Sequence, residues 1–344
     1  MIKISFCIPT LNRAGHLRAS LTSIVCQADE TVEIVIVDGG STDDTLEVIE
    51  SFKVTFPQIR VYPSESRSGV DRDILQSVAL AEGIFCWLFS DDDLLETGAL
   101  SRVSKVIQDF PEIAGASLNH IAYDAEMNYS IATVPAAGHG ALRRNHLFSD
   151  RNKCLSVLGV HIGFISCQVV RRSLWAKVVE NRDLTPHCNS WIIVYIIGEM
   201  LGQNPSWFYV HDVCVRYRSG NDSFVSRVGI YNRQRISHVA YADTIGSLLP
   251  RNSTAYRNIF KILISDRMPR TLAVLKSKGI TLSGQFRLFS MYVRRYWSYP
   301  TFWIKVIPIF LVPNSLVRLI ERIYRGLRKR KSAVRQEVIV QDIE

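Results

Sequence analysis

Three adjacent carboxylates are the strongest chemical signal in the sequence. Asp91, Asp92 and Asp93 directly follow the apolar run Ile84–Phe89, which is typical of a buried parallel strand. Carboxylates this close repel one another unless a cation or hydrogen-bond donors compensate them. Hard divalent cations such as Mg²⁺ and Mn²⁺ prefer oxygen ligands and share them with phosphates. The cluster favours a metal that holds a diphosphate, and the alternative is a solvated loop whose last Asp caps the next helix.

Two more polar clusters follow apolar runs nearer the N-terminus. One is the segment 9–13 (PTLNR), and the other begins at Asp38, which precedes two glycines. Glycine allows tight turns and close approach of the backbone to a ligand. A carboxylate at Asp38 can accept a hydrogen bond from a base N–H or a ribose hydroxyl, so we interpret it as a ligand contact. Turn and cap chemistry explains Ser41, which is predicted to cap the following helix with Asp44 three residues on.

The elements that position these clusters alternate between strand and helix patterns. Such β-α-β repeats with short connections predict an α/β protein with a doubly wound, mostly parallel sheet. Ligands of such sheets bind beyond the carboxyl ends of the strands, where all three clusters lie. Hydrophobic periodicity predicts strands at 2–10, 32–37, 59–62, 84–89, 114–120 and 165–170, helices at 71–81 and 191–201, and mostly helical structure after residue 225.

The three clusters resemble the motifs of family 2 glycosyltransferases, which have the GT-A fold. Residues 5–13 (SFCIPTLNR) resemble the opening motif, 34–45 (IVIVDGGSTDDT) the second motif, and 89–93 (FSDDD) the D-x-D metal motif. The resemblance covers residues 1–225. It implies a Rossmann-like nucleotide-sugar-binding half at 1–115, an acceptor-binding half at 116–225, and a helical C-terminal region at 226–344.

The same resemblance implies roles for individual residues. It implies Mg²⁺ or Mn²⁺ as the cofactor, bound by Asp91 and Asp93, and an inverting transfer from a nucleotide-diphosphate sugar. Arg218, in the segment YRSGND, can close over the diphosphate, or it belongs to a surface turn built on Gly220. Residues expected to contact the nucleotide-sugar are Pro9, Thr10, Asn12, Arg13, Asp38, Gly39, Asp71, Ser90, Asp91, Asp92 and Arg218.

A finer similarity points to abequosyltransferase-type enzymes, which add a dideoxyhexose to a lipid-linked O-antigen unit. It rests on residues 69–74 (GVDRDI), 85–93 (FCWLFSDDD) and 98–100 (GAL). It implies a saccharide acceptor linked to polyprenyl diphosphate and a role in surface polysaccharide biosynthesis. Asp71 is then a donor contact, or an ordinary acidic residue in the first turn of a helix.

The catalytic base is not marked by the family pattern. Family 2 enzymes usually carry an Asp in an "E-D" motif about one helix before a "Y-R" strand, and residues 215–218 (VRYR) resemble that strand. The region before it contains Asn189, Ser190 and Trp191 and has no carboxylate pair. Asp183 and His187 are the nearest titratable candidates for the group that takes the acceptor's proton. Glu199 is a weaker candidate inside the next helix.

The basic charge of the chain belongs to its C-terminal segment. Residues 286–331 contain eleven Lys and Arg and one acidic residue, Glu321. The net charge of this segment, 11 − 1 = +10, exceeds the net charge of +9 for the whole chain. Aromatic residues accumulate at 291–311, and the longest uncharged stretch there, 306–317, is too short to span a bilayer. This composition suits a segment at an anionic membrane interface. A helical layer on the core and a nucleic-acid-binding patch are the alternatives.

The remaining features favour a cytoplasmic enzyme on the inner face of the membrane. The seven cysteines form no C-x-x-C pair, which favours free thiols, and the first six residues lack the pattern of a signal peptide. A nucleotidyltransferase is a weaker alternative, because a glycine- and arginine-rich phosphate loop is expected after its first strand, where this chain has PTLNR. A non-enzymatic membrane- or nucleic-acid-binding protein leaves the carboxylates at several strand ends unexplained.

Overall fold

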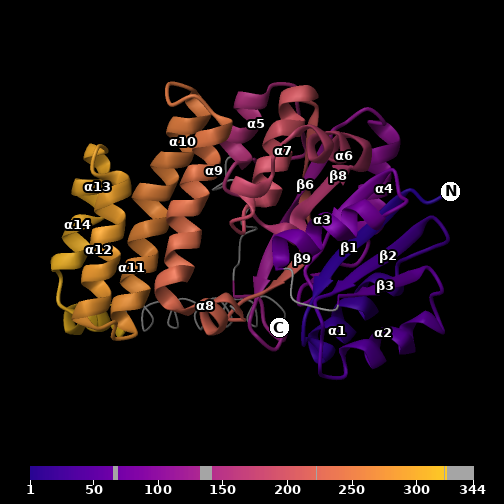
Figure 1. The fold of residues 1–344 in the computed structure, drawn as a ribbon, viewed down its shortest axis with the longest axis horizontal. Coiled ribbons are helices and arrows are strands. Elements are labelled where there is room, and N and C mark those ends of the chain that lie inside the picture. The colour runs from indigo at the N-terminus through magenta and orange to yellow at the C-terminus, as the bar shows by residue number, and fades with distance from the viewer. Residues whose placement is uncertain (65–68, 132–141, 222, 321, 324–344) are drawn as a thin grey trace, which may run out of the picture. The chain divides into compact units, whose positions relative to one another are not determined.

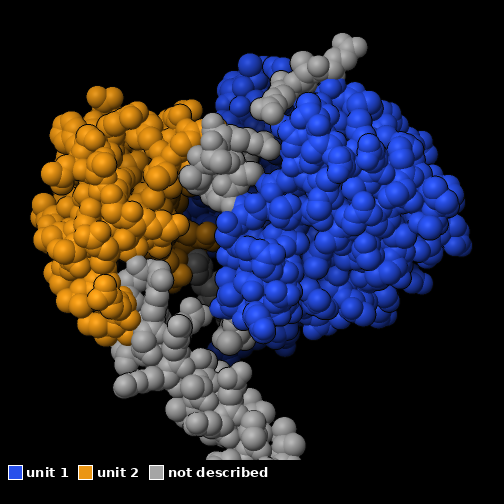
Figure 2. Space-filling model, turned by 90° about the horizontal axis from the view of Figure 1, so that it is seen from below, with its two compact units in different colours: residues 1–227, 240–259 blue, residues 228–239, 260–344 orange. Residues whose placement is uncertain are grey.

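The structure is a computed structural model, and it describes residues 1–64, 69–131, 142–221, 223–320, 322 and 323. The chain forms two compact units (Figure 2). The first unit consists of residues 1–227 and 240–259, and the second of residues 228–239 and 260–344. The acidic cluster lies in the first unit.

One sheet with the strand order β3-β2-β1-β4-β8-β6-β9-β5 organises the first unit, and β7 pairs with β9 (Figure 1). The four strands β3, β2, β1 and β4 are parallel, so their carboxyl ends meet at one edge. The strands are β1 (Ile4–Thr10), β2 (Val32–Asp38), β3 (Ile59–Pro63), β4 (Phe85–Leu88), β5 (Leu94–Leu95), β6 (Gly115–Tyr123), β7 (His146–Phe148), β8 (Gln168–Arg171) and β9 (Trp207–Arg218).

The other half of the sheet is mixed. Strand β8 runs antiparallel to both β4 and β6, whereas β6 and β9 are parallel. The predicted α/β class is confirmed, and the parallel arrangement holds within β3-β2-β1-β4 and between β6 and β9. The strand predicted at 165–170 begins later, because Ile165–Cys167 forms a 3₁₀ turn, η2, before β8.

Helices connect the strands of the first unit. Helix α1 packs against α2, and α3 packs against β1 and β2 (Figure 1). The helices are α1 (Ala14–Val25), α2 (Thr45–Lys53), α3 (Val70–Leu80), α4 (Ala99–Asp109), α5 (Arg151–Leu158), α6 (Arg172–Asn181), η3 (Thr185–His187), α7 (Ile192–Gln203), α9 (Tyr241–Leu248) and, continuing past Ile259, α10 (Thr254–Ile262).

The prediction that Ser41 caps the second helix is wrong. Helix α2 begins at Thr45, and the side chain of Ser41 bonds back to the carboxylate of Asp38. Asp43 instead contacts the first residues of two helices. Its Oδ1 accepts a hydrogen bond from the hydroxyl of Thr45, which begins α2, and its Oδ2 accepts one from the N–H of Ala14, which begins α1. The loop after β2 is thus folded around two carboxylates before the helix starts.

The core of the first unit fixes the strands that carry the polar clusters. The rings of Phe6 and Trp87 stack 4.9 Å apart on the neighbouring strands β1 and β4, and Phe89 packs edge-on against both. All three side chains are fully buried. Stacked and edge-on aromatic pairs add to the free energy gained by burying apolar area. The two strand ends next to this core are therefore held in a fixed register.

Helices and two π-helical turns build the second unit. Helix α8 (Ser223–Gln234) contains a kink at Gly229, where φ is +73°. Among the described residues no single helix is long and apolar enough to cross a bilayer; 300–311 and 314–320 pass the length and composition test only as a pair, which is bent by 99°. The elements are η4 (Arg235–Ala240), η5 (Leu263–Arg267), α11 (Met268–Ser277), α12 (Leu282–Tyr296), α13 (Pro300–Lys305) and α14 (Ile307–Leu311). The basic residues from 324 onward lie outside the described part.

Candidate active site

The first carboxylate of the acidic cluster is tied to the end of β1. The hydroxyl of Thr10 donates a 2.8 Å hydrogen bond to Oδ2 of Asp91. Thr10 ends β1 and Asp91 follows β4, and these strands are parallel neighbours. Both side chains are buried. The structure therefore brings together two of the sequence motifs, the segment 9–13 and the acidic cluster, as the sheet topology predicts.

Asp93 is the most buried member of the cluster. Its Oδ2 accepts a 2.6 Å hydrogen bond from the Ser166 hydroxyl, and its Oδ1 accepts a 3.0 Å bond from the Arg218 N–H. Burial, with the charges of Asp92 and Asp91, raises the pKa of Asp93 to about 8 despite these two donors. The ionised carboxylate therefore needs a cation beside it at neutral pH.

Asp92 holds the loop at the end of β9. Its Oδ1 accepts from the Ser90 hydroxyl at 2.6 Å, and its Oδ2 accepts from the Asn221 side chain at 2.9 Å. The guanidinium of Arg218 donates to the backbone carbonyls of Asp92 and Ala125. Arg218 is thus joined to the acidic cluster through both its backbone and its side chain. In this arrangement the guanidinium supports the loop that carries the carboxylates.

The motif at the end of β2, which begins with Asp38, lies at the same carboxyl edge of the sheet. Asp38 is buried at 1% exposure, and its carboxylate accepts from the N–H and hydroxyl of Ser41. Gly39 donates its N–H to the carbonyl of Thr10, and Gly40 has a φ of +86°, which favours glycine. The motif after β1 is joined to it, because the side-chain oxygen of Asn12 accepts from the Thr42 N–H at 2.7 Å.

The other predicted donor contacts lie on the same strands and loops. Pro9 pairs with Val37 across β1 and β2 and is half-buried. Arg13 donates its backbone N–H to the Thr45 hydroxyl at 3.0 Å. Each predicted residue near the N-terminus therefore lies at the shared carboxyl edge of the parallel strands.

Two residues that the sequence analysis missed belong to this edge. Ser166 follows no recognisable motif, and only the fold brings it to Asp93. His16 lies in the first turn of α1, where burial and the positive charges of Arg218 and Arg13 lower its pKa. Its position three residues after the PTLNR motif is a signal that could have pointed to it. The imidazole is therefore neutral at pH 7 and is close enough to Asp92 to feel its charge.

Asp71 lies at the start of α3 but is bonded to the start of α7. Its Oδ2 accepts a 2.6 Å hydrogen bond from the N–H of Ser190, a residue with a φ of +76°, and the Ile192 N–H also donates to it. Burial raises the pKa of Asp71 to about 6. The side chain is only 8% exposed. A carboxyl with a pKa in this range can accept a proton near neutral pH.

The two predicted base candidates lie in the same loop, before α7. Asp183 is exposed, and hydrogen bonds from the Thr185 N–H and hydroxyl lower its pKa. The ring of His187 stacks on Tyr195 with centroids 3.5 Å apart, and partial burial lowers its pKa. Glu199, the weaker candidate, is paired with Arg182 at 2.6 Å. Asp71 is therefore more buried than Asp183 or Glu199.

The residues at Asp91 and Asp93 fit a hard divalent cation. They offer carboxylate oxygens, which are the ligands that such a cation prefers. Burial and the charges of Asp92 and Asp91 raise the pKa of Asp93, so a cation beside it would favour its ionised form. A separate group, His120, His161 and Cys167, has its ligand atoms within 4.8 Å of one another. Burial raises the pKa of the Cys167 thiol and the two imidazole rings stack, so we interpret this group as packing.

The parallel sheet and the acidic cluster at its carboxyl edge define an α/β enzyme with a nucleotide-type site. Residues 5–178 match the family described as glycosyl transferase family 2. The chain belongs to this family, and it is a glycosyltransferase of class EC 2.4 that uses a nucleotide-sugar donor. The non-enzymatic alternative is therefore wrong.

Three known proteins illustrate the relationship. Abequosyltransferase RfbV of Salmonella typhimurium is 27% identical over 278 residues, which make up 77% of this chain and 80% of that protein. The structure is similar to S. aureus TarS 1–349 in complex with UDP-GlcNAc, with a TM-score of 0.51, 16% identity and coverage of 94% and 92% of the two chains. In a longer structure of TarS the chain spans 49% of that protein.

The mannosyltransferase PcManGT of Pyrobaculum calidifontis, in complex with GDP-Man and Mn²⁺, has a similar fold. Its TM-score is 0.55 at 14% identity, and the match covers 92% of this chain and 87% of that one. These likenesses establish the fold as a mixed, mostly parallel GT-A sheet followed by C-terminal helices.

Proposed function

We propose that the chain transfers a sugar from a nucleotide-diphosphate sugar to a lipid-linked saccharide during the synthesis of a bacterial surface polysaccharide. The observation that carries the site is the buried Asp93, held by Ser166 and the Arg218 N–H beside two further carboxylates. The similarity to an abequosyltransferase supports the acceptor class. A deoxyhexose is accordingly the first donor sugar to test.

The nucleoside of the donor lies against the loops after β1 and β2. Asp38 offers its carboxylate to a base N–H or a ribose hydroxyl, and Gly40, with a φ of +86°, allows the tight turn that follows it. The diphosphate lies toward Asp91 and Asp93. Mg²⁺ or Mn²⁺ bound by these two residues would supply charge neutralisation for the departing diphosphate.

The acceptor side of the reaction belongs to the loop before α7. A hydroxyl of the acceptor attacks the anomeric carbon of the donor, the bond from that carbon to the diphosphate breaks, and a base takes the hydroxyl proton. Asp183 and His187 are the candidates named from the sequence, and Asp71 joins them through its bond to Ser190. A single displacement of this kind inverts the anomeric centre.

The second unit provides the membrane contact in this proposal. Several large apolar side chains of this unit are exposed to solvent. Basic residues are interspersed among them, as at Arg287 and Lys305, and this combination favours an anionic bilayer surface. The apolar residues concerned are Leu282 (84% exposed), Phe286 (71%), Trp297 (65%), Ile304 (67%) and Leu311 (79%).

Calorimetric titration of UDP, GDP, CDP and dTDP, each with and without Mn²⁺, tests the donor site. We expect metal-dependent binding of one nucleotide, and we expect Asp93→Ala to abolish it. Asp109→Ala is the matched control, because Asp109 is an exposed carboxylate on α4 that pairs only with Lys105 among the described residues. Binding of CDP in particular would favour the abequosyltransferase-like donor.

Two results would count against the proposal. Absence of binding of all four nucleotides by folded protein, with lipid present, would remove the donor site. Equal binding by wild type and a folded Asp93→Ala variant would move the site away from the acidic cluster. For the membrane contact, we expect the protein to sediment with vesicles of phosphatidylglycerol but not with vesicles of phosphatidylcholine. Equal amounts of protein in both pellets would exclude an electrostatic contribution to membrane binding.

A further inference from the structure

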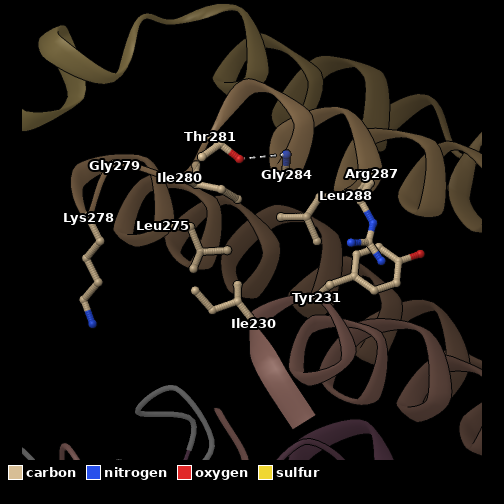
Figure 3. A pocket seen from close by; sticks show the side chains of 10 residues that line it. All are labelled: Ile230, Tyr231, Leu275, Lys278, Gly279, Ile280, Thr281, Gly284, Arg287 and Leu288. Carbon is tan, nitrogen blue, oxygen red and sulfur yellow. Dashed lines mark hydrogen bonds between the residues drawn. The ribbon is translucent and has the colours of Figure 1, made fainter. Parts of the chain in front are cut away.

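The second unit contains a pocket of about 360 Å³, a size typical of small-molecule sites. Its walls come from α8 beyond the kink at Gly229, from the end of α11, from the turn between α11 and α12, and from the first turns of α12. Aliphatic side chains line it, and Figure 3 shows them next to one another: Ile230, Leu275, Ile280 and Leu288. The reaction site described above uses none of these residues.

Basic side chains surround this aliphatic lining. Lys278 and Arg287 lie on opposite sides of it, and the Arg287 guanidinium lies 4.4 Å from the ring centroid of Tyr231 (Figure 3). The Arg318 guanidinium reaches the same rim, within 3.9 Å of the position a Cβ would take at Gly279. No Asp or Glu is among the residues that line the pocket, and within the described part of the chain these three cations have no carboxylate partner.

A fourth cation lies next in the sequence to one of the lining residues. Lys276, the neighbour of Leu275, is buried at 2% exposure. Its ammonium donates to Oε1 of Gln285 at 2.6 Å and to the carbonyl of Phe310 at 3.1 Å, so its hydrogen bonds go to neutral acceptors. The charge is solvated locally and is not cancelled. Among the described residues the pocket therefore combines an apolar interior with basic side chains that have no carboxylate within ion-pair distance.

This combination fits a phosphate attached directly to a hydrocarbon chain. We propose that the pocket binds the lipid carrier of the acceptor, with the first isoprene units against Ile230 and Leu288 and the carrier's phosphate against Arg287. A phospholipid fits less well, because glycerol and ester groups separate its phosphate from its chains, whereas the aliphatic lining here begins beside the cations. The inference rests on the proposed lipid-linked acceptor and names the part of the chain that recognises it.

Binding of farnesyl phosphate, a soluble isoprenyl monophosphate, tests the pocket when measured by calorimetry below its critical micelle concentration. Two control ligands separate its parts: farnesol has the isoprenyl chain without the phosphate, and inorganic phosphate has the charge without the chain. We expect the full-length protein to bind farnesyl phosphate at least tenfold more tightly than either. Arg287→Glu removes a charge-assisted contact and should weaken binding at least tenfold. Lys261→Glu, an exposed cation on α10, is the matched control.

A second variant tests the pocket without changing its charge. Ile230→Trp fills the pocket from a 44% exposed position, so it should weaken farnesyl phosphate binding while leaving the fold intact. Nucleotide binding should be unchanged in both variants, which separates this inference from the donor site. Farnesyl phosphate binding that both variants leave unaltered would overturn the proposal. Competition by phosphatidylglycerol vesicles that matches farnesyl phosphate would instead assign the pocket to the bilayer and also overturn it.

Discussion

The hydroxyl of Ser166 lies 2.6 Å from Oδ2 of Asp93 and donates a hydrogen bond to it. The same hydroxyl oxygen accepts the N–H of Ser90 at 3.0 Å. Ser166 belongs to the 3₁₀ turn before β8, the antiparallel strand that lies between β4 and β6. One side chain from the mixed half of the sheet therefore fixes both the backbone before the acidic cluster and its most buried carboxylate.

Replacing Ser166 by Ala should weaken metal-dependent nucleotide binding by about tenfold, because an orienting hydrogen bond to a charged group contributes about 1.5–3 kcal/mol. The N–H of Ser90 also loses its acceptor, so we expect a loss of about 1–2 kcal/mol in the free energy of unfolding. Calorimetry of the nucleotide with Mn²⁺ and chemical denaturation measure the two effects. Ser101→Ala, at an exposed position on α4, should change neither. Unchanged nucleotide affinity in folded Ser166→Ala would mean that the bond does not orient Asp93.

The parallel half of the fold could be predicted from the sequence because its signals are local. Apolar β-branched runs mark the strands, and each strand is followed at once by its polar motif, so residues such as Thr10 and Asp91 meet through the parallel topology alone. The mixed half gives no such signal. A strand that runs antiparallel between two parallel ones is set by tertiary pairing, and Ile165–Cys167 looks like part of a strand until that pairing is known.

The candidate site divides in the same way. Asp38 ends β2 and Asp93 lies in the loop after β4, whereas Asp71 is joined to Ser190 across a sequence separation of 119 residues. The prediction that Ser41 caps α2 failed because its hydroxyl has a closer and charged partner in Asp38. Local capping patterns compete with such bonds, and only the folded loop decides between them.

Asp71 is expected to act as the base of the transfer reaction. Its pKa of about 6 is better matched to proton transfer near pH 7 than the lowered pKa of the exposed Asp183. Asp71→Asn should therefore reduce kcat by about 10²–10⁴-fold and leave nucleotide affinity unchanged. In wild type kcat should fall as pH drops through about 6, because the carboxyl then holds its proton.

Rates of three variants across pH 5–9 separate the candidates. Asp183→Asn should change kcat by less than about threefold, because an exposed carboxylate with a lowered pKa is a weak base. If Asp71→Asn changes kcat only slightly and kcat still falls below about pH 6, the carboxyl of Asp71 only supports the start of α7. A large loss in His187→Gln would then transfer the role to that imidazole. Thermal unfolding of each variant checks that it is folded.

Glu33 should be the most sensitive charged position of the parallel sheet. It is buried in β2 at 3% exposure, and its carboxylate accepts from the Ser5 hydroxyl at 2.6 Å, the Arg60 guanidinium at 2.5 Å and the Glu82 N–H at 2.6 Å. Removing one partner of a buried ion pair costs about 3–5 kcal/mol. We expect the loss of stability in Glu33→Ala to lie near the lower end of this range, because Arg60 is partly exposed.

Chemical denaturation measures this loss in the free energy of unfolding. Glu180→Ala on α6 is the control, since an exposed carboxylate away from such partners should shift the value by no more than about 0.5 kcal/mol. A comparable shift in both variants would show that the buried network adds little to the stability of the sheet.

His238 should make the second unit sensitive to acid. Its Nδ1 lies 2.9 Å from the Tyr292 hydroxyl, and its backbone carbonyl accepts from the Tyr296 hydroxyl. Burial, with the positive charges of Arg233 and Arg267, lowers the pKa of His238 to about 3. The unfolded chain binds this proton near pH 6.5, so the contribution of His238 to stability is complete above that pH and is lost as pH falls toward 3.

Between pH 7.5 and 5 the loss should be about 2 kcal/mol, because each unit of pH below the unfolded pKa costs about 1.36 kcal/mol. Hydrogen exchange of α12 amides at several pH values measures it within the second unit. His238→Gln keeps a neutral acceptor for Tyr292 and cannot take up the proton, so its stability relative to wild type should rise as pH falls. A difference between the two proteins that stays constant from pH 7.5 to 5 would mean that the imidazole is already protonated in the folded unit or reaches water there.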